Sequence, residues 1–454
     1  MKDLFSSSIY NIKDFGAVDD AKTINTKIIA EVITTCAENG GGTVYVPAGV
    51  FLSGSIVLKS NVHLFLDAGA ILSFVPDVNE YPVVQSRWEG VKRDVYSSCI
   101  YAENEENISL TGYGTLEGNG DFWWNSFRNK KLSYPRPKLV SFDHCNHIQI
   151  SGVKMKNSPS WTVNPICCEN ITITNITIIN PPNSPNTDGI NPESCRNVRI
   201  SDSYIDVGDD CIAIKSGTEE TVERVPCENI TIINCTMIHG HGGIVIGSEM
   251  SGDIRNVTVS NCVFEGTDRG IRLKSRRGRG GVIEDIRVSN IVMKDVICPF
   301  IFNLYYYFGP RGNEKFVYDK NPYPITEKTP VFRRIHFSNI TAREVSAAAG
   351  FIHGLAEMYV EDITFNDISI AMKENANAAL PAMMAGLEPM KQRGFYCTNV
   401  SDIQFNKVTI SNHEGPAFYV ENGKNVEIVA CRSKNPVNKE TALSFFKNVT
   451  TTDE

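Results

Sequence analysis

The chain lacks any run of apolar residues long enough to cross a membrane, which takes about 18 to 20 consecutive apolar residues. Its first residues, Met1-Lys2-Asp3-Leu4-Phe5, also lack the basic and then apolar pattern of a secretion signal. We therefore expect no membrane partner. We also expect a cytoplasmic protein, unless a leader has been removed.

An excess of positive charge is missing as well. The 454 residues contain 44 Lys and Arg against 52 Asp and Glu, which gives a net charge of -8. A general nucleic-acid binder needs a basic face for phosphate, so this balance argues against a nucleic-acid partner. A polyanionic ligand held by a local basic cluster is still compatible with it.

Cysteine spacings typical of zinc sites are absent. The chain has thirteen cysteines but no Cys-x-x-Cys pair, and the adjacent Cys167-Cys168 is too closely spaced. Several of the others, such as Cys211, Cys235 and Cys262, lie inside β-branched runs, where small buried thiols are expected. The sequence therefore predicts mostly reduced core cysteines, no metal and no cofactor.

Long helical patterns are scarce too. Residues 23–39 form the best candidate helix, ended by Gly40-Gly41-Gly42, and its apolar face would comprise Ile24, Ile28, Val32, Ile33 and Cys36. A single amphipathic helix ahead of a repeat array is what a cap on the open end of the array requires. Short strands are expected around it, at residues 9–16, 43–46, 54–58, 62–66 and 70–74.

A repeated phrase occupies the chain from Asn107 onward. It has the form Asn-Ile-Thr-Ile, and its starts mostly lie 23 to 32 residues apart, at Asn107, His147, Asn170, Asn197, Asn229, Asn256, Asp285, Arg334, Asp362 and Asp402. Several short strands per unit at this period are typical of a parallel β-helix, whereas the Leu-x-x-Leu-x-Leu frame of leucine-rich repeats is missing. We predict one all-β solenoid domain over residues 1–454. Residues 1–60 would form the helical cap and first strands, and 61–454 the coils with inserted loops.

Four inserts interrupt the period, and inserts on a solenoid generally form the walls of its binding face. They are residues 81–98, 121–137, 303–330 and 371–394.

Three carboxylates recur at about the spacing of one coil. Asp188 precedes the pair Asp209-Asp210 by 21 and 22 residues, so they can stack on one face. Two carboxylates across a sugar ring can hydrolyse a glycosidic bond, and a third raises its neighbour's pKa. The alternative is that these residues cap turns in Asn-Thr-Asp and Gly-Asp-Asp.

A histidine and two cations follow. His241 lies between glycines, with room for a ligand, although it could equally be a turn histidine. Arg272 and Lys274 would share one face of a strand and repel each other unless an anion joins them. The ligand would then carry a carboxylate, with the cluster extended by Arg276, Arg277 and Arg279. The alternative is a solvated strand edge protected by charge.

The motifs Asn-Thr-Asp at 186–188, Gly-Asp-Asp at 208–210, Gly-His-Gly at 240–242 and Arg-Leu-Lys at 272–274 occur in this order. Together they resemble the polygalacturonase family of glycoside hydrolases, over roughly residues 10 to 430. The resemblance implies a right-handed parallel β-helix enzyme that cleaves the α-1,4-galacturonosyl linkages of pectin, a cell-wall polysaccharide, or of its oligomers, with inversion.

The resemblance also implies roles for single residues. Asp209 would be the general acid, Asp188 with Asp210 would activate the water, and His241 would support the protonation of the acid. The substrate carboxylate on the leaving-group side would be held by Arg272 and Lys274. Asn186 would bind substrate, and so would a tyrosine one coil beyond the cations. Tyr306 fits this position best, although Tyr305 and Tyr307 are adjacent.

The region Trp88-Glu89-Gly90 resembles bacterial exo-acting members, in which added loops block one end of the cleft. Exo-action is therefore the expected mode, with a terminal sugar bound by Arg87, Trp88, Trp123 and Trp124. The alternative is that these loops cover the coil edges and their aromatic residues are core. Two other classes remain open: a pectate lyase acting by elimination, and a non-catalytic glycan-binding β-helix. The oligomeric state is left open.

Overall fold

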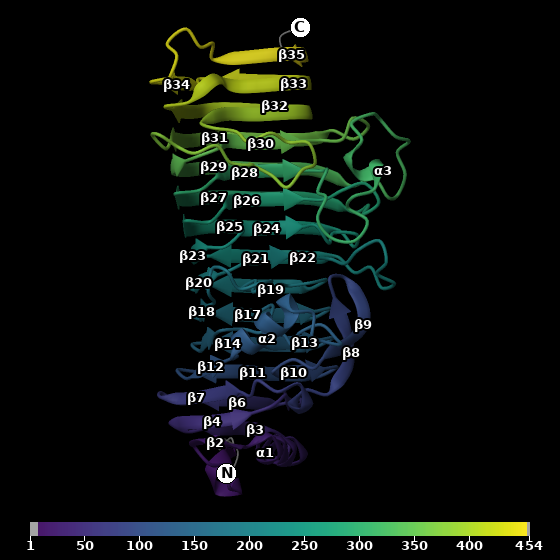
Figure 1. Ribbon diagram of the computed structural model, residues 1–454, viewed down its shortest axis with the longest axis vertical. Helices are drawn as coiled ribbons and strands as arrows, with labels where there is room; N and C mark the ends of the chain where they lie inside the picture. The colour runs from purple at the N-terminus through teal and green to yellow at the C-terminus, as the bar shows by residue number, and fades with distance from the viewer. Residues whose placement is uncertain (1–7, 452–454) are drawn as a thin grey trace, which may run out of the picture. The chain divides into compact units, whose positions relative to one another are not determined.

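The computed structural model describes residues 8–451, in two compact units that meet in the chain at the Asp209–Asp210 bond (Figure 1). We call residues up to Asp209 the first unit and residues from Asp210 the second unit. Residues 1–5, on which the expectation about a secretion signal rests, lie outside the described residues. The prediction of one domain over residues 1–454 stays a prediction.

The first unit is a stack of parallel coils, drawn in purple and blue in Figure 1. The strands of its coils pair in parallel with those of neighbouring coils, in three ladders. The first ladder is β1 (Ile9–Asn11), β3 (Gly42–Val46), β6 (Val62–Leu66), β11 (Glu106–Gly112), β14 (Asn146–Ser151), β17 (Glu169–Thr174) and β19 (Arg196–Ser201). The second is β2 (Asp20–Ile24), β4 (Gly49–Ser53), β7 (Ala70–Phe74), β12 (Thr115–Glu117), β15 (Lys154–Lys156), β18 (Thr177–Ile179) and β20 (Tyr204–Val207). The third is β5 (Ile56–Val57), β10 (Ile100–Glu103), β13 (Val140–Asp143) and β16 (Val163–Ile166).

The second unit repeats this arrangement with longer strands. One ladder runs through β21 (Asp210–Ile214), β24 (Gly242–Gly247), β26 (Arg269–Lys274), β28 (Cys298–Asn303), β30 (Ala348–His353), β32 (Arg393–Ser411), β33 (Glu414–Val429) and β35 (Ser444–Thr451). Its other strands are β22 (Cys227–Ile233), β23 (Thr236–His239), β25 (Ile254–Glu265), β27 (Val282–Lys294), β29 (Val331–Val345), β31 (Val360–Met372) and β34 (Arg432–Lys434). The predicted parallel β-helix is confirmed.

The repeated phrase builds the coils in a simple way. Each of its ten starting residues has a left-handed backbone, with φ between +52° and +59°, which Asn and Asp tolerate better than most residues. The chain turns there and enters a strand. Alternate positions then point inward, so that Ile171 and Ile173 are fully buried while Thr172 is only half-buried.

The predicted capping helix is confirmed as α1 (Thr26–Glu38), which begins three residues later than expected. Its buried face was predicted partly wrongly, because Ile24 lies exposed in β2 and Ile28 is half-buried. The buried residues are Ile29, Val32, Ile33 and Cys36. The glycines end the helix as expected, since the Gly41 N–H donates to the carbonyl of Cys36 at 2.9 Å.

Most of the early strands lie where the sequence places them, and β6 and β7 match to the residue. The pattern over residues 9–16 is a strand only as far as Asn11, and a 3₁₀ turn, η1 (Ile12–Phe15), follows. The expected strand at 54–58 shrinks to β5, because the Gly54 N–H donates to the side chain of Thr26 at 2.7 Å. Strand β4 was missed.

The inserts carry their own local structure. Residues 81–98 form an antiparallel hairpin of β8 (Val83–Trp88) and β9 (Val91–Tyr96). Two further inserts contain short helices, α2 (Gly120–Arg128) and α3 (Lys315–Tyr318). The insert at 371–394 is irregular, with an antiparallel bridge between Ala379 and Met390. Helix α2 was not anticipated.

The cysteines lie inside the coils as thiols rather than disulfides: eleven are buried, and Cys167 and Cys431 are half-buried. Among residues 8–451, no helix has the length and apolar character needed to cross a membrane.

Candidate active site

In the first unit, the loop after β18 presents Asp188. The carboxylate is 3% exposed and accepts a hydrogen bond from Asn191 Nδ2 at 2.9 Å. The preceding residue, Thr187, ties this loop to the next coil, because its hydroxyl accepts the N–H of Gly208 at 3.3 Å. The loop that carries Asp188 is thereby fixed to the turn that carries Asp209.

That turn requires glycine before Asp209. A Cβ atom at Gly208 would lie 2.5 Å from the carbonyl oxygen of Ser184, so no larger residue fits without a shift of backbone. Asp209 follows at the end of the unit and is half-buried. The motif Gly-Asp-Asp therefore reflects close packing between coils as well as chemistry.

A buried arginine that sequence reasoning missed completes this region. Arg136 is 1% exposed and donates to the carbonyl oxygens of Pro159 at 2.9 Å and Pro185 at 2.7 Å, and to Asn186 Oδ1 at 2.6 Å. Burial lowers the pKa of Arg136 to about 10, while the nearby carboxylates of Asp188 and Asp209 favour its charged form. Its setting in Tyr-Pro-Arg-Pro-Lys, inside an insert, was the available signal.

Asn186, predicted to bind substrate, thus has its side-chain oxygen engaged by Arg136. The same arginine lines a pocket of about 350 Å³ in the first unit, and its guanidinium lies 4.2 Å from the centre of the Phe127 ring. The other lining residues include Trp88, Lys130 and Tyr134. Aromatic and cationic side chains suit a sugar acid, whose ring is apolar on its faces and whose carboxylate is charged.

Three of the four residues expected to bind a terminal sugar are instead occupied inside the protein. Trp123 and Trp124 are buried in α2; Trp123 packs edge-on against Tyr81 at 5.1 Å, and Trp124 donates its indole N–H to the Ser158 carbonyl at 3.0 Å. Arg87 is buried and donates to Ser194 Oγ at 3.0 Å. For the two tryptophans, the core interpretation was the right one. Trp88, which stacks on Trp161 at 4.9 Å, lines the pocket.

In the second unit, Asp210 joins the two predicted cations. Lys274 Nζ lies 2.9 Å from one carboxylate oxygen and Arg272 Nη1 lies 3.4 Å from the other, with all three side chains at most 9% exposed. Burial by itself would raise the pKa of Asp210. The charges of Lys274, Arg272 and His241 outweigh burial and hold that pKa well below its usual range. Asp210 is therefore a carboxylate at every ordinary pH.

Asp210 thus provides, within the chain, an anion that joins the two cations, and the expectation that a ligand's carboxylate also binds them stays a prediction. Gly242 stands in register with Asp210 on the neighbouring strand, and a Cβ there would meet Val245 Cγ2 at 2.5 Å. Directly before it, His241 is exposed and close enough to stabilise the charge of Asp210. A Cβ at Gly242 would also lie 3.6 Å from Asp210 Oδ1 and 3.7 Å from Arg272 Cδ, so this glycine lies directly beside both side chains.

Of the three adjacent tyrosines, Tyr306 lies beside the cations. Its ring centre is 5.3 Å from Lys274 Nζ and 5.7 Å from the guanidinium carbon of Arg272. Tyr305 is fully buried and packs under Arg277 at 5.3 Å instead, and Tyr307 is half-buried.

A family model described as glycosyl hydrolases family 28 matches residues 36–381. The chain belongs to this family. It is a glycoside hydrolase.

Similar proteins span most of this family 28 chain. A probable polygalacturonase of Vitis vinifera is 33% identical over 93% of this chain and 86% of the relative. An endo-polygalacturonase of Pectobacterium carotovorum is also 33% identical, over 62% of this chain and 72% of the relative. The crystal structure of an exopolygalacturonase from Thermotoga maritima superposes with a TM-score of 0.73 at 31% identity, over 89% of this chain and 92% of that chain.

The arginines after Lys274 have structural roles in this family 28 enzyme, so they do not extend the cation pair as predicted. Arg277 donates to both carboxylate oxygens of Glu357, at 2.5 and 2.8 Å, and to the carbonyls of Phe316, Asp319 and Asn321. Arg276 and Arg279 both pair with Glu219. These arginines hold the insert at 303–330 and the loop that carries Glu219.

Replacing Arg277 with Met should therefore lower the stability of the second unit. It would leave Glu357 buried and ionised without a partner, a loss of about 3–5 kcal/mol, visible as a lower melting temperature. The matched control is Arg277→Met combined with Glu357→Met, which removes both charges and should recover much of the loss. A single variant as stable as the native protein would contradict this role.

A second missed residue is Met383, from the insert at 371–394. Arg272 Nη2 lies 2.9 Å from its sulfur, and Asn303 Nδ2 donates to its carbonyl at 3.0 Å. Neither periodicity nor motif in this Ala- and Met-rich stretch pointed to the cations.

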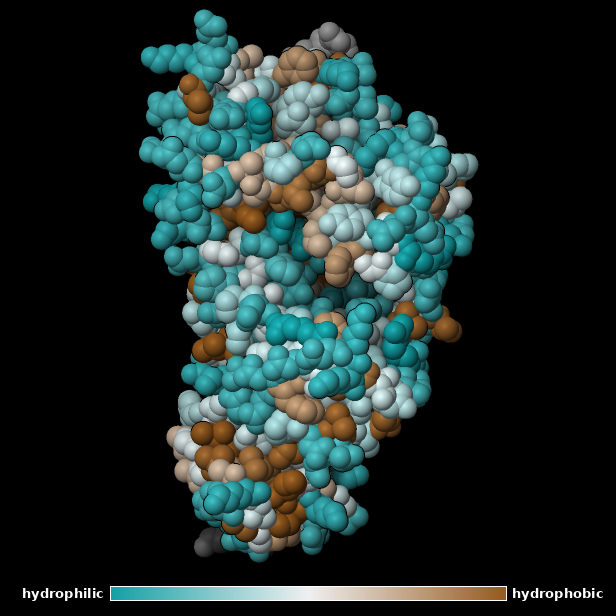
Figure 2. All heavy atoms as spheres, in the orientation of Figure 1, coloured by the Kyte–Doolittle hydropathy of each residue, from teal (hydrophilic) through white to brown (hydrophobic). Residues whose placement is uncertain are grey.

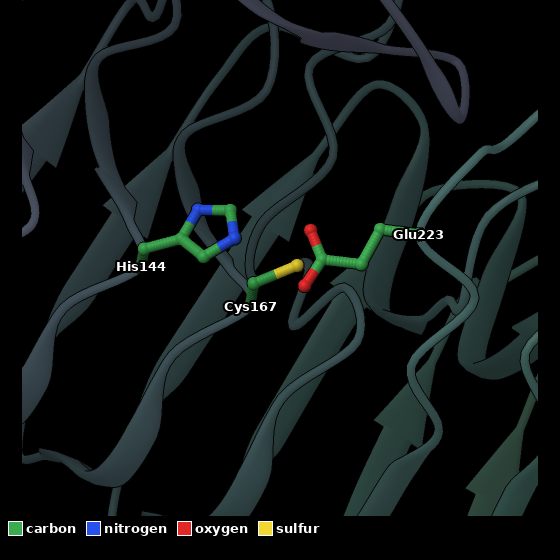
Figure 3. A group of neighbouring side chains, drawn as sticks. All are labelled: His144, Cys167 and Glu223. Atoms are coloured by element: carbon green, nitrogen blue, oxygen red, sulfur yellow. The ribbon is translucent and has the colours of Figure 1, made fainter.

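Figure 3 shows another group of polar side chains, of which His144 and Cys167 belong to the first unit and Glu223 to the second. His144 and Cys167 follow the paired strands β13 and β16. His144 Nδ1 is 2.5 Å from Asp143 Oδ1, and Arg87 Nη2 is 3.5 Å from the Cys167 sulfur. The first unit thus offers two ligands, fewer than the four of a structural zinc site, and we assign no metal to them.

Proposed function

We propose that this family 28 enzyme hydrolyses α-1,4-galacturonosyl linkages of polygalacturonate, or of its oligomers, with inversion of the anomeric carbon. The observation that carries the proposal is the buried Asp210 carboxylate joined to Lys274 and Arg272. It places a permanently ionised base next in the chain to the half-buried Asp209. Neighbouring carboxyl groups in contrasting surroundings are what an acid and a base need.

In the proposed reaction, Asp209 donates its proton to the glycosidic oxygen as the bond from that oxygen to the anomeric carbon breaks. A water molecule attacks the anomeric carbon from the opposite face and gives its proton to Asp188 or Asp210. Asp210 cannot be the acid, because its low pKa leaves it no proton to donate. His241 supports the protonation of Asp209.

The cations give the proposal its substrate class. Arg272 and Lys274 bring two positive charges to one Asp210 carboxylate, so one unit of charge is left for a substrate carboxylate. Tyr306 beside them offers an apolar ring face to the sugar. A lyase would need Arg272 as a free base, and its contact with Asp210 favours the hydrolase instead.

We propose exo-action on chain ends, and the pocket lined by Trp88 and Arg136 in the first unit offers aromatic and cationic side chains to a sugar acid. Similarity to the Thermotoga maritima exopolygalacturonase points the same way, although an endo-polygalacturonase is also among the relatives. A cytoplasmic location fits both the buried thiols and short imported oligomers as substrates.

The product profile tests the mode of attack. Early digestion of polygalacturonate, or of long oligomers, should yield mono- or digalacturonate while the viscosity barely falls. Reducing ends should appear without unsaturated product, which a lyase would form. A rapid fall in viscosity with a ladder of mid-sized oligomers would contradict exo-action.

A further inference from the structure

One column of side chains on the outer face of the second unit is buried where a regular β-helix would expose it. The strand register places Arg272, Ile301, Phe351 and Tyr396 one above another on β26, β28, β30 and β32. Their strand neighbours fill the core, so these four point away from it. Ile301 is nevertheless 1% exposed and Phe351 2%, whereas Tyr396 is half-buried. The column is thus covered on the two coils beyond Arg272, as it is at Val245 on the preceding strand β24.

The segment of residues 373–392, which leaves from β31 and returns to β32, lies against this side of the second unit. It reaches back as far as β26, where Arg269 donates to the carbonyls of Leu380 at 2.8 Å and Pro381 at 3.2 Å. A bridge between Met384 and Tyr306 holds it on the β28 side. In Figure 1 this yellow-green loop crosses in front of the strands, and Figure 2 shows hydrophobic side chains at that level.

The tip of the segment meets the cation pair. Met383 places its sulfur 2.9 Å from Arg272 Nη2, although a thioether is only a weak acceptor for a guanidinium. Arg272 is 3% exposed, so Met383 closes the outer edge of the guanidinium. An incoming carboxylate is a better partner. The flexible methionine side chain can move away from the guanidinium while the backbone of the segment stays in place.

We propose that residues 373–392 form a wall that ends the substrate groove just beyond the sugar held by Arg272 and Lys274, with Met383 as the residue that sets the limit. The segment contacts β26 at Arg269 and Arg272, and the buried Ile301 and Phe351 lie on the next two coils, which are spaced ~4.8 Å apart. This inference rests on the proposed function, in which the cations hold the leaving-group side. The leaving group is then about one or two galacturonate units, released from the reducing end of an oligomer or of a longer chain, and no part of the substrate lies along the later coils.

The two ends of the segment lie close together, so the residues between them can be removed. Lys373 and Gln392 lie together, since Gln392 Nε2 donates to the Lys373 carbonyl at 3.1 Å. Their N–H groups bond to the adjacent carbonyls of Val345 and Ser346. Replacing residues 374–391 with Gly-Gly should close this gap, and Ile301→Thr with Phe351→Thr keeps the uncovered face polar. A milder pair is Met383→Ala with Met390→Ala as its matched control on the same segment.

The test uses di- to pentagalacturonate carrying oxygen-18 at the reducing end, with products identified by mass spectrometry. In the native enzyme, labelled products should contain one or two sugars whatever the oligomer. The excised variant should release labelled products of three or more. Met383→Ala should raise kcat/KM for pentagalacturonate relative to trigalacturonate severalfold, and Met390→Ala should leave that ratio unchanged.

Labelled tri- or tetragalacturonate from the native enzyme would overturn the wall. An unchanged label profile in an active excised variant would do the same. If the excised chain does not fold, the native profile and the methionine pair decide. Failure of the native enzyme to hydrolyse any of these oligomers would instead contradict the proposed function, so the two failures are distinguishable.

Discussion

Asp209→Asn should lower kcat on trigalacturonate by about a thousandfold, the usual contribution of a positioned general acid. The amide keeps the shape of the carboxyl group but carries no proton to donate. KM should change little, because the cations that hold the substrate are untouched. Steady-state kinetics with a melting curve measures both effects, and the half-buried side chain should leave the melting temperature close to native.

A galacturonide with a nitrophenolate leaving group is the matched control for this variant. Such a leaving group departs without protonation, so the variant should retain most of the native rate on it. An equal loss on both substrates would mean that Asp209 acts in another way. A native rate on trigalacturonate would remove Asp209 from the mechanism altogether.

Asp210→Asn should cost both activity and stability. The change leaves Arg272 and Lys274 buried without their anion, a loss of about 3–5 kcal/mol. The water also loses a base. Denaturant unfolding and kinetics on trigalacturonate measure the two losses. Adding Lys274→Met should restore part of the stability, because one buried cation is removed, but none of the activity.

The lowered pKa of Asp210 also predicts the direction in which the stability of the native protein changes with pH. Because the pKa of Asp210 is lowered in the folded state, its contribution to stability is fully present above the unfolded value of about 4 and is lost as pH falls through the folded value below it. The native melting temperature should therefore fall more steeply below about pH 4 than that of Asp210→Asn, which keeps only the contributions of other carboxyl groups such as Glu219 and Glu249. Identical slopes in the two proteins would contradict the assigned partners.

The periodic part of the molecule could be predicted from the sequence because residues close together in the chain specify each coil. An Asn or Asp that accepts a left-handed turn, followed by alternating Ile and Thr, specifies one coil, and the next coil repeats it. The ordered motifs from Asn186 to Lys274 could be found for the same reason, since each falls at one place in its coil. The contact of Asp210 with Lys274 does not follow from register, because Asp210 pairs with Gly242 and Lys274 with Gly247, and the long lysine side chain spans the offset.

The inserts follow no such rule, and there sequence reasoning failed. The Trp123-Trp124 pair in a loop looked like a sugar platform, but α2 turns both rings into the core against Tyr81 and Ser158. Arg136 and Met383 meet the site through long-range packing that no spacing records. The arginines after Lys274 looked like a binding cluster, although their partners lie 34 to 80 residues further along or in a preceding loop.

The most direct test of the central claim is proton NMR of trigalacturonate during its first turnover by the native enzyme, with ultraviolet absorbance recorded in parallel. An inverting hydrolase acting through Asp209 and Asp210 must release the β-anomer first from an α-linkage, with no unsaturated product. The α-anomer should appear only later, by mutarotation. Initial release of the α-anomer, or absorbance from an unsaturated sugar, would contradict the mechanism.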